Sequence, residues 1–288
     1  MKGFTLKRGA GMALGILGLA CGSARAAQAG DNLVQVGWLH IFPESSSVPL
    51  HTQLQPSLVG SLLGVQSSFD SPGTSAKVGQ ADTFGLITTR FLTDHFAVQL
   101  VTGIPARVDI SGSGVVRPTG LLGQFLNVDL GAPQNNPLVS VQEWTPVGLL
   151  QYYFGRRTDK WHPYIGVGIS YAWFSGYSLN GDFQKSLESN FGSVLSLATG
   201  HFGATHVTAS ASRSWNPVYN AGLSYDLSKH WSLATSVTYS PLASVATINV
   251  LAQDGTLLAN SKTRLSQNAL VTALLVNYRF RFLSGTVR

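Results

Sequence analysis

The stretch ALVTALLVNYRFRF, residues 269–282, alternates between two kinds of side chain. One parity is mostly bulky, apolar or aromatic, and the other is small, amide-bearing or basic. The first set is Leu270, Thr272, Leu274, Val276, Tyr278, Phe280 and Phe282, and the second is Ala273, Leu275, Asn277, Arg279 and Arg281. A period of two places these sets on opposite faces of a β-strand. An apolar face that ends in aromatics, opposite a face with arginines, is typical of a membrane barrel with a polar interior.

The same alternation recurs along the chain, which offers eight strand candidates. They are expected at residues 32–42, 81–92, 96–110, 142–154, 161–174, 213–227, 231–250 and 263–282. Three connections are tight turns, and four are long, at about 43–80, 111–141, 175–212 and 251–262. Short turns that alternate with long loops over an even number of strands indicate an outer-membrane barrel. The expected fold is all-β: an eight-stranded antiparallel transmembrane β-barrel with short periplasmic turns and long outer loops.

Two local features refine this pattern. Proline cannot donate to a strand ladder, so the four prolines in these segments are expected near strand ends. They are Pro105, Pro146, Pro163 and Pro217. The third long loop carries Leu187, Phe191, Val194 or Leu195, and Ala198 at helical spacing. This spacing predicts a short amphipathic helix on the barrel mouth, with a loosely ordered loop as the alternative.

The first 29 residues have the pattern of a secretory signal peptide, which leaves residues 30–288 for the barrel. Lys2, Lys7 and Arg8 precede a short apolar run at 9–21, which is too short for a stable transmembrane helix. Ala27-Gln28-Ala29 is a small-x-small cleavage site. Cleavage is therefore expected between Ala29 and Gly30, with a cut after Ala26 as the less favoured alternative.

Cysteine usage and charge exclude several classes of protein. The only cysteine, Cys21, lies within the expected signal and fits a lipidation site poorly, so the mature chain needs no disulfide. Four of the 19 Lys and Arg residues also lie in the signal, which leaves 15 basic against 13 acidic residues. A net charge of +2 argues against a nucleic-acid-binding surface. The low charged fraction of 11% also fits a membrane barrel better than a soluble enzyme.

Aromatic residues gather at the ends of the expected strands. Rings at both ends of apolar strands are typical anchors at the membrane–water interface. The interface candidates are Tyr152, Phe154, Trp161, Trp173, Trp231, Tyr278 and Phe280. The alternative is that these rings form the core of a soluble sandwich.

Several of these segments, in this order and at this spacing, resemble the OmpW family of eight-stranded outer-membrane barrels. The most specific is QYYFG at 151–155, followed by WHPYIGVGI at 161–169. FLTDHFAVQL at 91–100 is similar to the first periplasmic hairpin of the family, and Tyr278-Arg279-Phe280 is similar to its end. The chain departs from the family pattern by continuing from Arg281 to Arg288. The resemblance implies that this extension blurs the C-terminal signal that the barrel-assembly machinery reads, with Phe282 as an alternative terminal aromatic.

The resemblance implies a passive conduit for small hydrophobic molecules, with sideways exit into the lipid of the cell outer membrane. Strand parity gives the residues that face the lumen: Gln99, Val101, Gln151, Tyr153, Tyr164, Asn220, Leu275 and Asn277. They carry too little charge for an ion-selective ring. The expected partners are outer-membrane lipid and lipopolysaccharide, the barrel-assembly machinery and small hydrophobic solutes.

Two questions stay open at this point. The resemblance makes Trp215 a candidate lumen gate, whereas its parity with Tyr219 and Tyr225 places it on the lipid face unless a bulge intervenes. Eight strands leave little room inside, so the barrel is also compatible with a plugged lumen. In that case the chain is a non-conducting surface receptor or adhesin whose long outer loops bind partners such as phage or bacteriocin.

Enzymatic and metal chemistry find little support in the sequence. His230-Trp231-Ser232 has the His-x-Ser spacing of lipid-modifying barrels, but it lies in a turn expected at the wrong leaflet. His201 and His206 share a loop, and two loop histidines are too few for a metal site. No phosphate loop or dinucleotide fingerprint occurs in the sequence. We therefore expect neither an enzyme nor a bound cofactor.

Overall fold

The computed structural model describes residues 27–57, 66–118, 126–156 and 158–281. Most of the expected signal peptide, including Cys21, lies outside these residues, and so does Phe282. The strands are β1 (Asp31–Ser47), β2 (Leu50–Leu54), β3 (Ser68–Ser71), β4 (Ser75–Val78), β5 (Ala81–Phe91), β6 (Phe96–Gly103), β7 (Ala106–Ser113), β8 (Val115–Val116), β9 (Val128–Asp129), β10 (Val139–Trp144), β11 (Val147–Tyr153), β12 (Trp161–Leu179), β13 (His206–Ala211), β14 (Ser214–Asp226), β15 (Trp231–Leu251) and β16 (Leu257–Arg281). The helical segments are η2 (Pro133–Asn135), α2 (Gly181–Leu187), η3 (Glu188–Gly192) and α3 (Ser193–Thr199).

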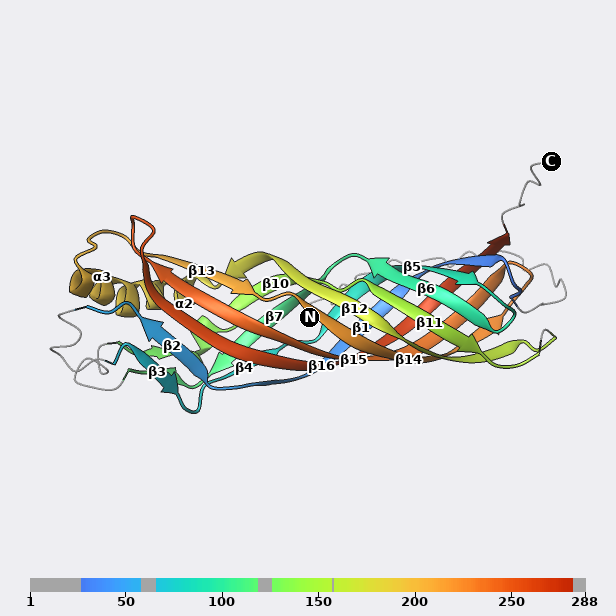
Figure 1. The fold of residues 1–288 in the computed structure, drawn as a ribbon, viewed down its shortest axis with the longest axis horizontal. Helices are drawn as coiled ribbons and strands as arrows, with labels where there is room; N and C mark the ends of the chain where they lie inside the picture. The colour runs from blue at the N-terminus through green and yellow to red at the C-terminus, as the bar shows by residue number, and fades with distance from the viewer. Residues whose placement is uncertain (1–26, 58–65, 119–125, 157, 282–288) are drawn as a thin grey trace, which may run out of the picture.

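The long strands pair antiparallel in an order that returns to its start (Figure 1). The order runs β1, β5, β6, β11, β12, β14, β15, β16 and back to β1. In this ring Trp38 of β1 lies opposite Leu274 of β16, and Leu150 of β11 lies opposite Val167 of β12. The three tight turns after β5, β11 and β14 lie at one end, which we call the turn end. We call the opposite end, where the helices lie, the loop end.

The expected outer loops contain several strands that the sequence did not reveal. β1, β12, β15 and β16 continue past their expected ends, and shorter strands add to them at the loop end. β2 pairs with β16 and β3, β13 pairs with β15, and β4, β7, β10 and β12 pair in that order. The described residues therefore form sixteen strands rather than eight, because the tube is built well beyond the segments that alternate cleanly.

Two of the expected strands are each divided in two. The segment expected at 96–110 is β6 and β7, and the segment expected at 142–154 is β10 and β11. Pro105 and Pro146 lie in the two breaks, beside the ends of the strands that they separate. Pro163 and Pro217 lie close to the first residues of β12 and β14, so all four prolines are near strand ends, as expected.

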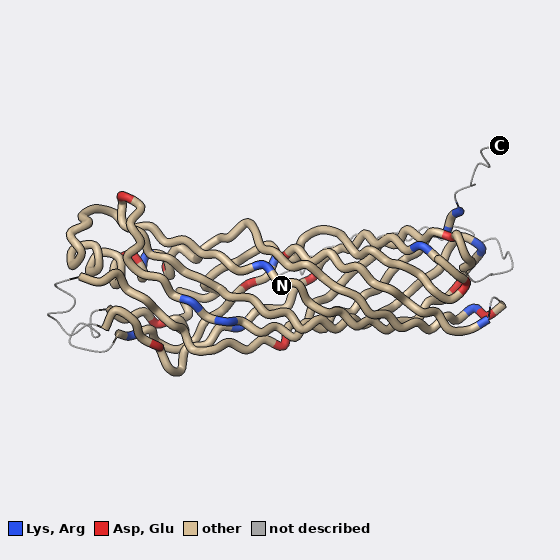
Figure 2. Tube along the Cα trace, viewed as in Figure 1, with Lys and Arg blue, Asp and Glu red and all other residues tan. Residues whose placement is uncertain are grey.

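The outward surface changes character along the tube. Toward the turn end its exposed side chains form an apolar belt, which includes Val36, Trp38, Phe84, Leu86, Val98, Leu100, Leu150, Ile165, Val167, Ile169, Leu233, Val237, Leu274 and Val276. β11, β12 and β15 contain no Lys, Arg, Asp or Glu, and the charges cluster elsewhere on the tube (Figure 2). Past Leu270 the outward face of β16 becomes polar, with Asn268, Ser266 and Arg264. The outward face of β1 changes at the same level, after Phe42.

The loop end has a hydrophobic core of its own under a helical cap. The cap consists of α2, η3 and α3, which bury Phe183, Leu187, Phe191 and Leu195 against the core. Asn180 begins the cap because its side-chain oxygen accepts hydrogen bonds from the backbone of Asp182 and Phe183. The predicted amphipathic helix is thus confirmed, in a longer form. None of the described helices has the length and apolar character needed to cross a membrane.

Candidate functional site

A cavity of about 290 Å³ lies inside the ring near its middle, and we call it the lateral cavity. Most of its walls are apolar. They include Leu39, Ile41, Ile87, Val101, Val147, Leu149, Val271, Ala273 and Leu275. Polar groups line it as well, from Gln99, Glu143, Asn220, Ser236 and Thr238. An apolar chamber with a few polar groups is the usual composition of a site for a small organic molecule.

The wall of the lateral cavity has a break, which we call the window. β6 and β11 pair as far as Val101 and Val147, and β7 and β10 pair from Ala106 and Glu143. Between these pairs lie two segments without ladder pairing to one another, residues 102–105 and 144–146, and all seven residues line the cavity. Proline has no N–H to donate, so Pro105 and Pro146 cannot complete the ladder there.

Both edges of the window are anchored elsewhere. On one edge, Ile104 N–H donates to the carbonyl oxygen of Phe84 at 3.0 Å. Gly103 has a φ of +152°, and a Cβ at this position would collide with that same carbonyl oxygen. On the other edge, the Trp144 ring stacks on Trp173 with centroids 5.7 Å apart, and its Nε1 donates to Ser175 Oγ at 3.0 Å. The opening is therefore held by contacts on each side rather than left loose.

Toward the turn end the lateral cavity is closed by a hydrogen-bonded floor of amides. Gln151 Nε2 donates to Gln99 Oε1 and to Asn220 Oδ1, each at 3.0 Å, and Gln99 Nε2 donates to Gln35 Oε1 at 3.1 Å. Tyr153 OH donates to Gln151 Oε1 at 3.2 Å. Stacked rings of Tyr153 and Tyr164, with centroids 4.8 Å apart, complete the floor. These contacts fill the interior at this level with packed side chains.

A cavity of about 390 Å³ lies on the other side of the floor, at the turn end. An inward-facing ion cluster lines it, in which Arg279 Nη2 lies 2.9 Å from Asp226 Oδ1. His162 Nε2 lies 3.4 Å from the other oxygen of the same carboxylate. Asp226 is fully buried, so the pairing compensates its charge. The inward arginine on the last strand therefore has a structural partner.

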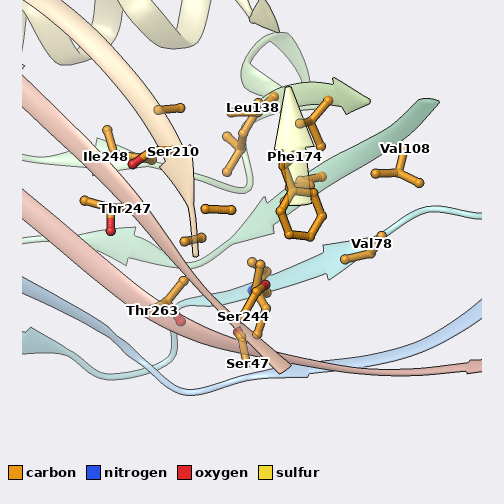
Figure 3. Close-up of a pocket in the computed structure, with 18 of the residues that line it drawn as sticks. Ser47, Val78, Val108, Leu138, Phe174, Ser210, Ser244, Thr247, Ile248 and Thr263 are labelled. Carbon is orange, nitrogen blue, oxygen red and sulfur yellow. Dashed lines mark hydrogen bonds between the residues drawn. The ribbon is translucent and has the colours of Figure 1, made fainter. Parts of the chain in front are cut away.

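A third cavity, of about 90 Å³, lies within the loop end, and we call it the loop-end cavity (Figure 3). Its walls are apolar residues such as Val78, Val108, Leu138, Phe174 and Ile248, with hydroxyls between them. The hydroxyls come from Ser47, Thr74, Ser75, Tyr177, Ser210, Ser244, Thr247 and Thr263. This cavity and the lateral cavity follow one another along the tube.

The model of the OmpW family matches residues 28–280 of the chain. The chain belongs to the OmpW family. Outer membrane protein W of Salmonella typhi is 25% identical over 246 residues, which cover 85% of this chain and 87% of that protein. This OmpW-family chain is accordingly a protein of the cell outer membrane.

Solved structures agree with the family assignment. The crystal structure of the outer membrane protein OprG from Pseudomonas aeruginosa matches with a TM-score of 0.64 at 21% identity, covering 89% of this chain and 99% of that one. The solid-state NMR structure of the outer membrane protein AlkL in DMPC bilayers matches with a TM-score of 0.51 at 16% identity, covering 99% of both chains. These likenesses show the fold, an all-β outer-membrane barrel.

The structure places the lumen candidates of this OmpW-family chain on the inward face. Gln99, Val101, Tyr164, Asn220 and Leu275 line the lateral cavity, and Tyr153 lines the turn-end cavity. Gln151 lies in the floor, and Asn277 is buried, with its Nδ2 donating to Ser232 Oγ at 3.0 Å. The interface candidates Phe154, Trp161, Trp231 and Tyr278 are exposed at the turn end, while Tyr152, Phe280 and Trp173 are partly covered.

The gate assignment of Trp215 does not agree with its position. Its side chain is 69% exposed and packs on Tyr171 at the outer surface, with centroids 4.7 Å apart. β14 pairs with β12 from Ala172 to Trp161 without a shift of register, so no bulge turns Trp215 inward. It lines none of the three cavities described above.

The sequence did not predict several other features of the site. Glu143, Gln267 and Gln35 all face the interior, and the window residues were read as continuous strand. One signal was available, since Glu143 shares its parity with Gln151 and Tyr153.

The histidines considered for catalysis or metal binding lie apart in other surroundings. His230 is exposed, and its Nδ1 lies 3.1 Å from the Arg279 carbonyl oxygen. Ser232, in contrast, is buried and faces the lumen. His201 pairs with Asp254 at 2.8 Å, and His206 is exposed on β13. Within the described ranges, no group of three or more His, Cys, Asp or Glu residues is arranged to hold a metal ion.

Proposed function

We propose that this protein is a narrow conduit that delivers small hydrophobic molecules into the outer membrane through its wall. In this proposal the eight paired strands span the membrane at the apolar belt, with the turn end in the periplasm and the loop end outside. The observation that carries the proposal is the window, which opens the lateral cavity sideways above a closed floor. A solute in this cavity has a route into lipid and none straight through.

The lining favours apolar solutes over ions and sugars. A hydrocarbon gains roughly 25 cal/mol for each Å² of surface that it removes from water. An ion would lose hydration in the lateral cavity, where Glu143 is the one charged side chain among the described lining residues. A sugar would leave many hydroxyls unpaired against walls such as Leu39, Ile87 and Leu149.

The window lies at the level where lipid can receive a solute. Phe84 and Val147 beside it belong to strands whose outward residues form the apolar belt. A molecule that leaves through residues 102–105 and 144–146 therefore enters an apolar phase without crossing water. The gap in strand pairing is set by two prolines, which have no N–H to donate. In this proposal the opening therefore does not depend on a moving gate.

The test is solute uptake by cells whose outer leaflet of lipopolysaccharide slows hydrophobic molecules. Cells that express the protein should take up radiolabelled n-octane faster than cells with an empty vector, with sugar uptake unchanged. Thr145→Trp, which places an indole in the window, should reduce uptake to near the empty-vector rate. The matched control is Thr235→Trp, which adds the same ring at an exposed position on β15 and should keep wild-type uptake.

Wild-type uptake by Thr145→Trp would contradict the sideways route. Faster sugar uptake without an octane effect would replace the conduit by a general porin. In both experiments the folded fraction of each variant is checked by its heat-modifiable mobility on a gel.

A non-conducting receptor or adhesin is the second candidate, and one observation favours it. The loop end is a folded extension, and Leu197 and Phe202 are its most exposed large apolar side chains among the described residues. In a receptor, these two side chains would contact the partner protein. If octane uptake is not accelerated, adsorption of phage or bacteriocin to the same cells, lost in a Leu197→Ser and Phe202→Ser double variant, would support this function.

A further inference from the structure

Glu143 occupies the junction between the two cavities above the floor. Among the described residues that line the lateral cavity and the loop-end cavity, it is the only one that lines both. Strand pairing fixes its position, because it lies between Ala106 of β7 and Phe174 of β12. A molecule that moves from the loop end to the window must therefore pass this carboxyl group.

Gln267 approaches the same place from another part of the wall. It lies on β16 between Ser45 of β1 and Leu242 of β15, and it lines the loop-end cavity. The Gln267 and Glu143 side chains are close enough to interact, but not through a hydrogen bond of normal geometry. Glu143 is 6% exposed and Gln267 is 4% exposed, so water reaches neither freely.

One polar atom of each side chain lacks a protein partner. Within the residues that the structure describes, Glu143 Oε2 and Gln267 Nε2 are buried without a hydrogen bond. Buried polar atoms are almost always satisfied in folded proteins, so two such atoms side by side in a cavity call for an occupant. The pair offers an oxygen that accepts and an amide N–H that donates.

We propose that Glu143 and Gln267 form a head-group site for an apolar molecule that carries a single hydroxyl, such as an aliphatic alcohol or a phenol. A hydroxyl donates one hydrogen bond and accepts others, so it satisfies Oε2 and Nε2 together. The apolar body then lies along the loop-end cavity or the lateral cavity. An alkane fits the same space but leaves both polar atoms unpaired, and the site therefore selects alcohols over alkanes.

This inference rests on the proposed conduit for its biological meaning, but binding tests it separately. The probe is an eight-carbon alcohol with a photoreactive diazirine in its chain, applied to the purified protein in lipid nanodiscs. Labelled peptides are mapped by mass spectrometry. Labelling should fall on residues around Glu143 and Gln267, and 1-octanol should compete roughly tenfold better than n-octane, as one hydrogen bond to a buried polar group allows.

Matched variants test whether Glu143 and Gln267 cause the preference for 1-octanol over n-octane. Glu143→Leu and Gln267→Leu should each abolish the advantage of 1-octanol while labelling of the cavity persists. The control is Gln142→Leu, which removes the same amide from the exposed face of the adjacent position and should leave the advantage intact. Heat-modifiable mobility identifies any variant that fails to fold, and the two substitutions on different strands make a shared folding defect easy to recognise.

The outcomes separate the site from the conduit. Equal competition by 1-octanol and n-octane in the wild-type protein would overturn the site and indicate that a water molecule fills it. Selective labelling in a protein that does not accelerate octane uptake would keep the site and overturn the conduit. Loss of selectivity in Gln142→Leu as well would also overturn the assignment to Glu143 and Gln267.

Discussion

The two halves of this tube follow opposite rules of hydrophobic placement along the same strands. On β16, the belt half turns Leu270, Leu274 and Val276 outward and Asn277 inward. Nearer the loop end the same strand turns Arg264 outward and Leu265 inward. The inward parity does not change along β16. This pattern is the one expected of a barrel with lipid around one half and water around the other.

The largest expected effect is local unfolding of the loop-end half alone. Phe183→Ala removes a fully buried ring from the loop-end core and should cost roughly 3–5 kcal/mol of local stability. The matched control is Phe202→Ala, whose side chain is 73% exposed and should cost little. Amide hydrogen exchange should speed up in α2 and α3 of the first variant only, while its heat-modifiable mobility stays normal. Loss of that mobility would show that the halves do not fold independently.

The next test places one arginine on the same face of β16 in each half. Leu274→Arg puts the charge in the apolar belt, where it should cost roughly 2–4 kcal/mol. Ser266→Arg puts it on the polar stretch beside the native Arg264, and it should cost close to nothing. The folded fraction on a gel measures both. Equal losses would mean that the boundary near Leu270 is misplaced.

Much of the belt half could be predicted, because its two faces differ at nearly every residue of strands such as β12, β15 and β16. The loop-end half could not, since its strands mix apolar and polar residues on both faces and pair with segments far away in the chain. β2, for example, pairs with β16 more than 200 residues later. No local sequence pattern predicts such a pairing.

Local alternation predicted part of the candidate site, and contacts between distant strands account for the rest. Parity alone placed Gln99, Gln151 and Asn220 inside, but their joining into a floor depends on side-chain packing across the lumen. Pro105 and Pro146 were visible as weak points of two strands. That they face one another across one window follows only from the register between β6 and β11 and between β7 and β10.

A smaller effect is expected at the floor, where the belt half has its polar interior. Gln151→Ala removes the hydrogen bonds to Gln99, Asn220 and Tyr153 and should cost about 1–3 kcal/mol. It should also open an axial leak, measured as ion conductance across a planar bilayer. Leu150→Ala, on the exposed face of the adjacent position, is the control and should leave the bilayer tight. A tight Gln151→Ala barrel would show that the tyrosine rings close the lumen without the amides.

The smallest effect concerns the tip of the loop end and asks whether it is in water. The backbone N–H and the hydroxyl of Thr256, together with His201, lower the pKa of Asp254 from 3.8 to about 2. Thr256 N–H donates to Asp254 Oδ1 at 2.9 Å, and His201 lies 2.8 Å from Oδ2. Because the folded pKa lies below the unfolded one, the carboxylate supports this turn fully above pH 3.8, and the support is lost as the pH falls toward 2. A carboxyl group placed in lipid would shift the other way, since burial in an apolar phase favours its neutral form. Carbon NMR of the labelled Asp254 carboxyl should therefore show a midpoint near pH 2, with Asp254→Asn to assign the signal. A midpoint above 3.8 would place the tip in an apolar environment and end the distinction between the two halves.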